Sequence, residues 1–367
     1  MTQRKRAVPI FWPAYDGADV QAAMADLFPA DMSNRWLGQA HRVDEFEALF
    51  SKKFGYRYSV SVSSGTAALE LAYHLIGIGE GDEVITPVLT CTATNIPLVR
   101  LKATIVFADI KDDFTISPED VEKRITKKTK AIVAVTLGGI PIDSRIPAIA
   151  KRYGIPLVID AAQSVGVGEK YGDYICYSFQ AIKNFTTGDG GMIVLRNKKE
   201  YARAKKLRWF GIDREAKIRA NWQPYKRRQM TMDIDEPGYK FHMNDIAASI
   251  GIVGLKHSDE YLRHRKKIAM YYDTHLDRLK YTPVSGGTYW LYGILTKNRD
   301  QVAEKAGEAG IETNMVHLRN DIFKVFGGKR LPLPTMKRLE KEYLYIPINT
   351  RMSVDDAHYV VRVLNAA

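Results

Sequence analysis

The chain has 367 residues, of which 46% are hydrophobic and 26% charged, and this ordinary composition excludes a disordered, collagen-like or disulfide-stapled protein. Its formal net charge of +12 favours anionic partners such as nucleic acid, a membrane surface or phosphorylated small molecules. The length allows about two domains. The only cysteines are Cys91 and Cys176, which favours a reducing compartment. Since no apolar run suits a signal peptide or a membrane span, we expect a cytoplasmic protein.

Short apolar runs alternate with helical patterns over most of the first 260 residues. Helices are expected from Ser64 to Gly77 and from Ser117, which Pro118 and two acids follow as in a helix start. The apolar runs predict strands at 58–62, 83–86, 104–108, 131–135, 156–159, 174–177 and 192–195. Several of these runs are apolar throughout, which is typical of strands buried on both faces. The sequence therefore predicts an α/β fold with a mostly parallel sheet.

The pattern changes after about residue 251. A long, charged amphipathic helix is predicted from about Asn244 to Leu279, followed by a strand over 289–295 and a helix over 300–309 that Gly310 ends. We expect a domain boundary inside the long helix. It would separate a large domain, residues 1–255, from a small C-terminal domain, residues 256–367.

Two segments suggest anion and cation binding at the edge of the predicted sheet. Ser64, Gly65 and Thr66 open a helix directly after a strand, where free backbone N–H groups at the positive helix end can hold a phosphate; a plain helix cap has the same pattern. Asp160 follows a buried strand, at the edge where α/β folds place ligands. A buried acid needs a cationic partner, although a helix cap explains Asp160 equally well.

A third segment places Lys183 between a predicted strand and a glycine-rich turn at 188–191. A partly desolvated lysine has a lowered pKa and can form a Schiff base; the alternative is a surface lysine in a loop. A pyridoxal phosphate (PLP) site combines three such parts: a helix start that binds the phosphate, an acid that pairs with the pyridinium nitrogen, and a lysine that can form a Schiff base.

These segments, with further motifs, resemble the DegT/StrS-type sugar aminotransferases nearly from end to end. The further motifs lie at 36–39, 43–47, 62–68, 81–85, 160–163, 238–241, 244–248 and 345–347. The resemblance implies a fold-type I PLP transferase with a mostly parallel seven-stranded sheet in the large domain and a smaller C-terminal α/β domain. It also implies a homodimer with shared active sites.

By position, the resemblance implies that Lys183 carries PLP and moves the proton, that Asp160 pairs with the pyridinium nitrogen, and that Gln163 lies beside the ring. The phosphate contacts that it implies are Gly65, Thr66, Ser178 and, across the dimer, Lys240. Family members often have Asn at the position of Lys240. The family usually has an aromatic residue stacked on the cofactor ring at the position of Cys91, and a thiol offers less contact area.

The implied reaction takes an amino group from L-glutamate and passes it to a keto sugar, usually a nucleotide-linked 3- or 4-keto-6-deoxy sugar, for amino-sugar or surface-polysaccharide biosynthesis. Relatives with His at the lysine position are dehydratases, and Lys183 argues against that reaction. His317 and Arg319 lie in a stretch, 314–320, that resembles the substrate region. It departs from the common His-Tyr-Pro pattern, which leaves open a keto-sugar acid without a nucleotide.

Ten Lys and Arg residues but only two acids lie between 202 and 228. Arg227 and Arg228 are candidate contacts for a diphosphate, with Trp209, Trp222 and Tyr225 near them in the chain; a solvated surface or a dimer contact is the alternative. A nucleic-acid-binding regulator is a rival interpretation, but no helix-turn-helix, zinc-finger or RNA-recognition pattern is present. We expect no metal site, because the cysteines and histidines lack ligand spacing.

Overall fold

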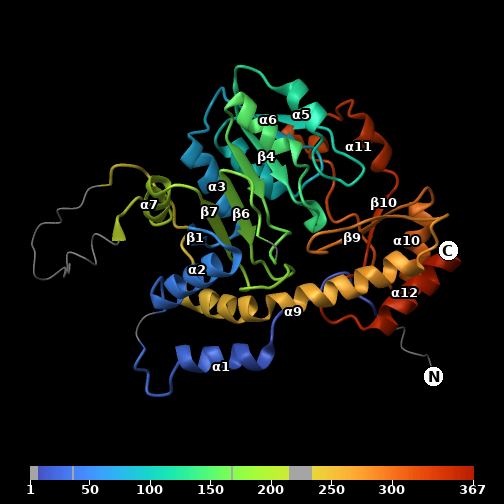
Figure 1. Ribbon diagram of the computed structural model, residues 1–367, viewed down its shortest axis with the longest axis horizontal. Coiled ribbons are helices and arrows are strands. Elements are labelled where there is room, and N and C mark those ends of the chain that lie inside the picture. The colour runs from blue at the N-terminus through green and yellow to red at the C-terminus, as the bar shows by residue number, and fades with distance from the viewer. Residues whose placement is uncertain (1–6, 35–36, 167, 215–233) are drawn as a thin grey trace, which may run out of the picture.

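The computed structural model describes residues 7–34, 37–166, 168–214 and 234–367, and a seven-stranded sheet lies at its centre (Figure 1). Its strands are β1 (Tyr58–Val62), β2 (Glu83–Pro87), β3 (Thr104–Ala108), β4 (Thr129–Val135), β5 (Leu157–Asp160), β6 (Tyr174–Ser178) and β7 (Gly191–Leu195). The order is β1-β7-β6-β5-β4-β2-β3. Only β7 runs antiparallel to its neighbours, β1 and β6; the other pairs are parallel. The predicted mostly parallel α/β fold is confirmed.

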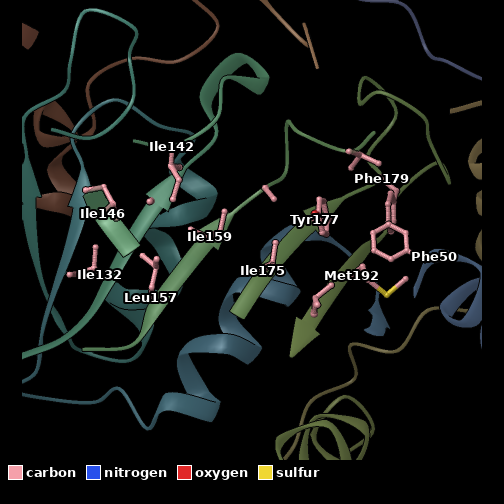
Figure 2. Packing of buried hydrophobic residues seen from close by; sticks show 14 of the residues in the cluster. Phe50, Ile132, Ile142, Ile146, Leu157, Ile159, Ile175, Tyr177, Phe179 and Met192 are labelled. Carbon is pink, nitrogen blue, oxygen red and sulfur yellow. The ribbon is translucent and has the colours of Figure 1, made fainter. Parts of the chain in front are cut away.

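Helices cover both faces of this sheet. One face carries α2 (His41–Phe54), α5 (Pro118–Arg124), α6 (Arg145–Tyr153) and the start of α9 (Asp245–His275), and the other carries α3 (Gly65–Ile76), α4 (Ile96–Arg100) and α7 (Lys198–Leu207). In β4, Ile132 packs toward the first group and Val133 toward the second, because successive strand residues point to opposite faces. Figure 2 shows the first cluster, in which Phe50 lies beside Phe179 at one end and Ile146 lies near Ile132 at the other.

Helix α3 begins and ends as the sequence predicts. The side chain of Ser64 accepts a hydrogen bond from the backbone N–H of Ala67 at 3.1 Å, which satisfies one of the free donors of the first turn. Gly77 follows the last turn with φ of +76°, a conformation that strains any residue with a Cβ. The first turn of α3 is therefore held at a defined place at the end of β1.

The C-terminal third forms a second, smaller sheet with its own helices. Its elements are β8 (Thr282–Val284), β9 (Tyr292–Leu295), β10 (Tyr343–Ile346), α10 (Arg299–Glu308), α11 (Pro334–Leu339) and α12 (Val354–Ala366), in the antiparallel order β10-β9-β8. Helix α9 runs beneath both sheets, with α1 (Gly17–Leu27) alongside it (Figure 1). Short 3₁₀ turns lie at Thr92–Thr94, Leu137–Gly139, Asn320–Ile322 and Lys324–Phe326.

The two ends of α9 belong to different cores. Leu255 packs in the cluster under the large sheet, whereas Ile268 packs with the small sheet and α12. The domain boundary near residue 255 stays a prediction. Val8 lies in the second core as well, paired with Ile311, although the predicted large domain included the N-terminus.

Two predicted elements are shorter in the structure. The long helix ends at His275 rather than near 279, because Leu276 adopts an extended conformation with ψ of 137°. The strand expected over 289–295 begins only at Tyr292, and the residues before it bond instead to the loop at 138–139. Within the described part of the chain, no helix combines the length and the apolar character that crossing a membrane requires.

Candidate active site

A cavity of about 730 Å³ lies at the carboxyl ends of β5 and β6, the edge where open α/β sheets bind ligands. It brings together eight of the residues selected from the sequence, which are Gly65, Thr66, Cys91, Asp160, Gln163, Ser178, Lys183 and His317. These residues come from segments up to 252 positions apart, so the fold assembles the site from several elements.

One end of the cavity is formed by the N-terminus of α3. A Cβ added to Gly65 would lie 2.7 Å from the Cβ of Ser178, so only glycine lets the helix approach β6 this closely. Thr66 and Ser178 line the cavity beside it. The partial positive charge of the helix end and its free N–H groups make this end suitable for a phosphate.

Asp160 is 4% exposed, at the end of β5. One carboxylate oxygen accepts a hydrogen bond from the hydroxyl of Thr94 at 2.7 Å, and the other accepts one from the N–H of Ala162 at 3.2 Å. Burial raises the pKa of Asp160, while these two donors act in the opposite direction. Turns rather than a helix follow Asp160, which removes the helix-cap alternative. The site therefore holds a carboxyl that a cationic ligand would stabilise in its ionised form.

Lys183 lies in the turn region after β6 and faces the cavity rather than the outer surface. Burial lowers its pKa to about 8, against the opposing influence of Cys91 and Asp160. Its Nζ lies 4.0 Å from the ring centroid of Trp290. A lysine with this pKa is about one-tenth neutral at pH 7, far more than an ordinary lysine, so its amine can act as a nucleophile and accept protons.

Gln163 and His317 form a fixed polar pair in the cavity wall. The Oε1 of Gln163 accepts a hydrogen bond from the N–H of Gly138 at 2.6 Å, which turns its Nε2 toward His317. Nε2 of Gln163 lies 2.9 Å from Nε2 of His317, so the histidine nitrogen is the acceptor. Burial and the charge of Lys183 lower the pKa of His317 to about 3, and the imidazole is neutral with its proton on Nδ1.

Among the residues of the cavity that were not selected from the sequence are the aromatic side chains Phe11, Trp290 and Phe323. Phe11 and Trp290 both line it, and their rings stack with centroids 5.4 Å apart. Trp290 was assigned to a strand, and no local pattern distinguishes such a residue from a core tryptophan. Cys91 is half-buried in the lining and is a free thiol.

Arg319 does not line the cavity of its own chain, so this geometry gives the expected substrate contact no support, and that contact stays a prediction. It is 3% exposed. Nε and Nη2 donate to the two oxygens of Asp321 at 2.7 and 2.5 Å, and Nη1 donates to Glu340 at 3.1 Å. The bonds to Asp321 lead in raising the pKa of Arg319. This guanidinium is engaged in an internal ion cluster, in which each of its three nitrogens already donates to an acceptor.

Lys240 is exposed, away from the cavity of its own chain, with Nζ 3.6 Å from the ring centroid of Trp209. Part of the basic segment is engaged internally. Arg208 is fully buried and paired with Glu47, and Arg203 is paired with Glu236. Arg227, Arg228, Trp222 and Tyr225 lie outside the described residues.

Among the described residues, one group of side chains is spaced like metal ligands, comprising Asp16, Asp19 and His257. Asp19 is already paired with Lys256 at 2.5 Å and with His257 at 2.9 Å. The group does not line the cavity.

The chain is similar along nearly its whole length to known proteins. The profile of the DegT/DnrJ/EryC1/StrS aminotransferase family matches residues 19–365. The uncharacterised protein MJ1066 of Methanocaldococcus jannaschii is 32% identical, over 99% of this chain and 97% of that protein. The spore coat polysaccharide biosynthesis protein SpsC of Bacillus subtilis is 30% identical over the same shares.

Solved structures share the fold. The sugar aminotransferase CalS13 of Micromonospora echinospora is 28% identical and superposes with a TM-score of 0.88, over 98% of this chain and all of that one. The PLP form of the putative sugar aminotransferase Spr1654 of Streptococcus pneumoniae is 25% identical with a TM-score of 0.87, over 98% of each chain.

The residues present fit PLP. Asp160 is a nine-tenths-buried carboxyl whose hydrogen-bond partners are neutral, as the partner of a pyridinium nitrogen must be. Lys183 supplies an amine of lowered pKa, and the close approach at Gly65 leaves room for a phosphate beside Ser178. With the match over residues 19–365, the chain is a PLP-dependent aminotransferase and belongs to the DegT/DnrJ/EryC1/StrS aminotransferase family.

Proposed function

We propose that the protein transfers an amino group from L-glutamate to a keto sugar, with the chemistry centred on Lys183. The observation that carries this proposal is the pairing of a low-pKa lysine with a buried, unneutralised carboxyl, Asp160, in one cavity. SpsC is a polysaccharide biosynthesis protein and CalS13 a sugar aminotransferase, which supports a sugar as the acceptor and a role in making amino sugars.

Each end of the cavity has its own task in holding the cofactor. The first turn of α3, at Gly65 and Thr66, and the hydroxyl of Ser178 would bind the phosphate. Asp160 would keep the pyridine nitrogen protonated, and Gln163 would lie at the ring edge. When bound, PLP supplies an aldehyde that joins amines and a ring that withdraws electrons from the carbon next to them.

Lys183 performs two tasks in this proposal. Its neutral amine would hold the cofactor between reactions. In the first half-reaction Nζ would take the proton from Cα of the donor and pass it to the carbon that carries the cofactor's aldehyde, and in the second half-reaction it would move a proton in the opposite direction. The lowered pKa suits both tasks, because an amine with a pKa near 8 exchanges protons readily close to neutral pH. Cys91 would lie beside the cofactor ring in the place of an aromatic residue.

The acceptor in this proposal is a nucleotide-linked 3- or 4-keto-6-deoxy sugar. His317, whose pKa is lowered by burial and by the charge of Lys183 and whose Nε2 faces Gln163, would offer its Nδ1–H to a sugar oxygen. Arg227 and Arg228 would attract the diphosphate, as their place in a strongly basic stretch suggests.

A second copy of the chain is part of the proposal. Lys240 is exposed and does not reach the cavity of its own chain, which fits a residue that binds the cofactor phosphate of a partner subunit. The protein would then be a homodimer whose sites share residues.

To test this, the PLP-loaded enzyme is treated with L-glutamate and the form that has accepted the amino group is isolated. A panel of keto sugars, with and without a nucleotide, is then added to it. Return of the yellow PLP colour identifies an acceptor. We expect it with a nucleotide-linked keto sugar. If the colour returns only with keto-sugar acids, the acceptor belongs to that class instead. If the colour returns with 2-oxo acids but with no keto sugar, the proposal is contradicted.

A further inference from the structure

Trp290 contacts both Lys183 and the residue before it. The indole N–H donates a hydrogen bond to the backbone oxygen of Ile182 at 2.8 Å. The face of the same ring lies toward Nζ of Lys183, with 4.0 Å between the nitrogen and the ring centroid. The tryptophan is 1% exposed. A single side chain from the C-terminal part of the chain therefore holds the lysine's backbone and its reactive nitrogen.

The backbone next to Trp290 is bonded to other parts of the site. Thr288 donates its N–H to the oxygen of Gly139 at 3.2 Å and its hydroxyl to the backbone oxygen of Gln163 at 2.7 Å. These bonds connect the segment to the loop that orients the side chain of Gln163. A displacement of this segment would therefore disturb several groups of the cavity together.

The placement of Trp290 is constrained further by its neighbours. Tyr289 has φ of +51°, a left-handed conformation that costs free energy in a residue with a Cβ and persists only where the surroundings enforce it. Nη1 of the buried Arg265 lies 3.4 Å from the backbone oxygen of Trp290 and 3.5 Å from that of Tyr289. Phe11 stacks on the ring. The indole is thus fixed beneath Lys183 rather than free to turn.

The charged and titratable groups around Nζ have opposing effects on the protonation of the Lys183 amine. Asp160 favours the protonated amine, as does the nearby thiol Cys91. Burial opposes protonation of the amine, and the charge of Lys183 in turn lowers the pKa of His317. The π face of an indole attracts an ammonium group, so Trp290 acts with Asp160 to stabilise the protonated form.

We propose that Trp290 is a positioning residue for Lys183, which fixes the place of Nζ through the bond to Ile182 and stabilises its protonated form through the ring face. This role concerns the capture of PLP by the lysine, in which the amine and the aldehyde join with loss of one water. It is independent of the amino donor and of the sugar acceptor.

The test compares W290L and W290F with the wild type as full-length protein freed of PLP. The pKa of Lys183 is measured from the pH dependence of its acetylation, followed by mass spectrometry of the Lys183 peptide. The rate of PLP capture is measured from the appearance of the yellow colour at a pH where the amine is neutral in every variant.

In W290L the ring face is gone, and we expect the pKa of Lys183 to fall by about half a unit to one unit. W290F keeps a ring and loses the N–H donor, so its pKa should change less. Both variants should capture PLP about three- to tenfold more slowly, the loss expected when one hydrogen bond that positions a reactive group is removed.

The matched control is L291A. Leu291 is also 1% exposed and packs in the same cluster, and its backbone N–H bond to Gly138 survives the substitution. L291A should lose stability but keep the wild-type pKa and capture rate. Wild-type values in W290F and W290L, or equal changes in L291A, would overturn the proposal. If W290L does not fold, the PLP capture rates of W290F and L291A test the proposal. Slower capture in W290F alone supports it, and equal rates in the two variants overturn it.

Discussion

Two groups of buried charge in this molecule differ in how they are neutralised. Around Arg319, the guanidinium is matched by Asp321 and Glu340, and every donor nitrogen has an acceptor. In the cavity, Asp160 accepts bonds only from neutral donors, and Lys183 is held with a pKa lowered to about 8. A neutralised cluster stabilises the fold, whereas charges kept apart and incompletely compensated are available to a ligand.

The same contrast bears on the prediction that Arg319 contacts the substrate. Arg319 was selected because it lies, with His317, in a stretch that resembles a substrate region. Its partner Asp321 is two residues away and was visible in the sequence. The competing pattern, a short-range Arg–Asp pair, describes the structure better.

Lys183→Ala is expected to have the largest effect on activity. The variant should lose the yellow colour of the lysine-bound cofactor and all measurable transamination, because no other amine of the described residues lines the cavity. Absorbance spectra after addition of PLP, together with an amino-transfer assay, check this. Wild-type colour and turnover in the variant would place the cofactor on another lysine.

Asp160→Asn should reduce turnover by about 10²–10³-fold, the usual cost of removing an electrostatic group that acts on the reacting atoms. In the protein freed of PLP, the same change should not lower the melting temperature, because a buried carboxyl with a raised pKa costs stability at neutral pH. Calorimetry with and without PLP separates the two effects. Near-normal turnover, or clear destabilisation without PLP, would mean that Asp160 stabilises the fold instead.

Arg319→Ala should behave in the opposite way. Removing one member of a buried, fully bonded ion cluster costs about 3–5 kcal/mol of unfolding free energy, since Asp321 is left without its partner. Denaturant unfolding measures this loss. The folded variant should retain the colour of bound PLP and its affinity for both substrates. An increase in a substrate KM without a loss of stability would restore Arg319 as a substrate contact.

The lowered pKa of Lys183 should appear in the pH dependence of stability. Its usual value is 10.5 and its folded value about 8, so between these pH values the unfolded chain binds more protons than the folded one. Stability of the protein freed of PLP should therefore gain a contribution that rises with pH from about 8 to 10.5 and is absent in Lys183→Met. Parallel curves for the two proteins would show that the lysine is not desolvated.

The smallest effect is expected at Arg227 and Arg228. Charge attraction that acts through solvent is weak and is screened by salt, so changing both to Ala should raise the KM of the sugar by about two- to fivefold and leave the donor half-reaction unchanged. Steady-state kinetics at low and high salt test this. An unchanged sugar KM would mean that this basic segment is an ordinary solvated surface. Sequence-preferring DNA binding by the wild type would instead favour the rival interpretation, a nucleic-acid-binding regulator.

The sequence predicted the parts of the site that depend on local order along the chain. Asp160 follows its strand directly and Gly65 opens its helix, and the parallel sheet brings both to one edge. Local order along the chain does not identify Trp290, because its contact with Lys183 joins residues 107 positions apart and depends on where the C-terminal part packs. The strained conformation at Tyr289 also leaves no mark in the sequence.

Lys183 is the residue on which the proposed function depends most, because it would carry the cofactor. Reducing the PLP-loaded protein with borohydride fixes the cofactor to its lysine, and mass spectrometry of the peptides then locates it. We expect one pyridoxyl group per chain, on Lys183, and none in Lys183→Ala, in which Asp160 is intact. A pyridoxyl group found mainly on any other lysine of the wild type would contradict it.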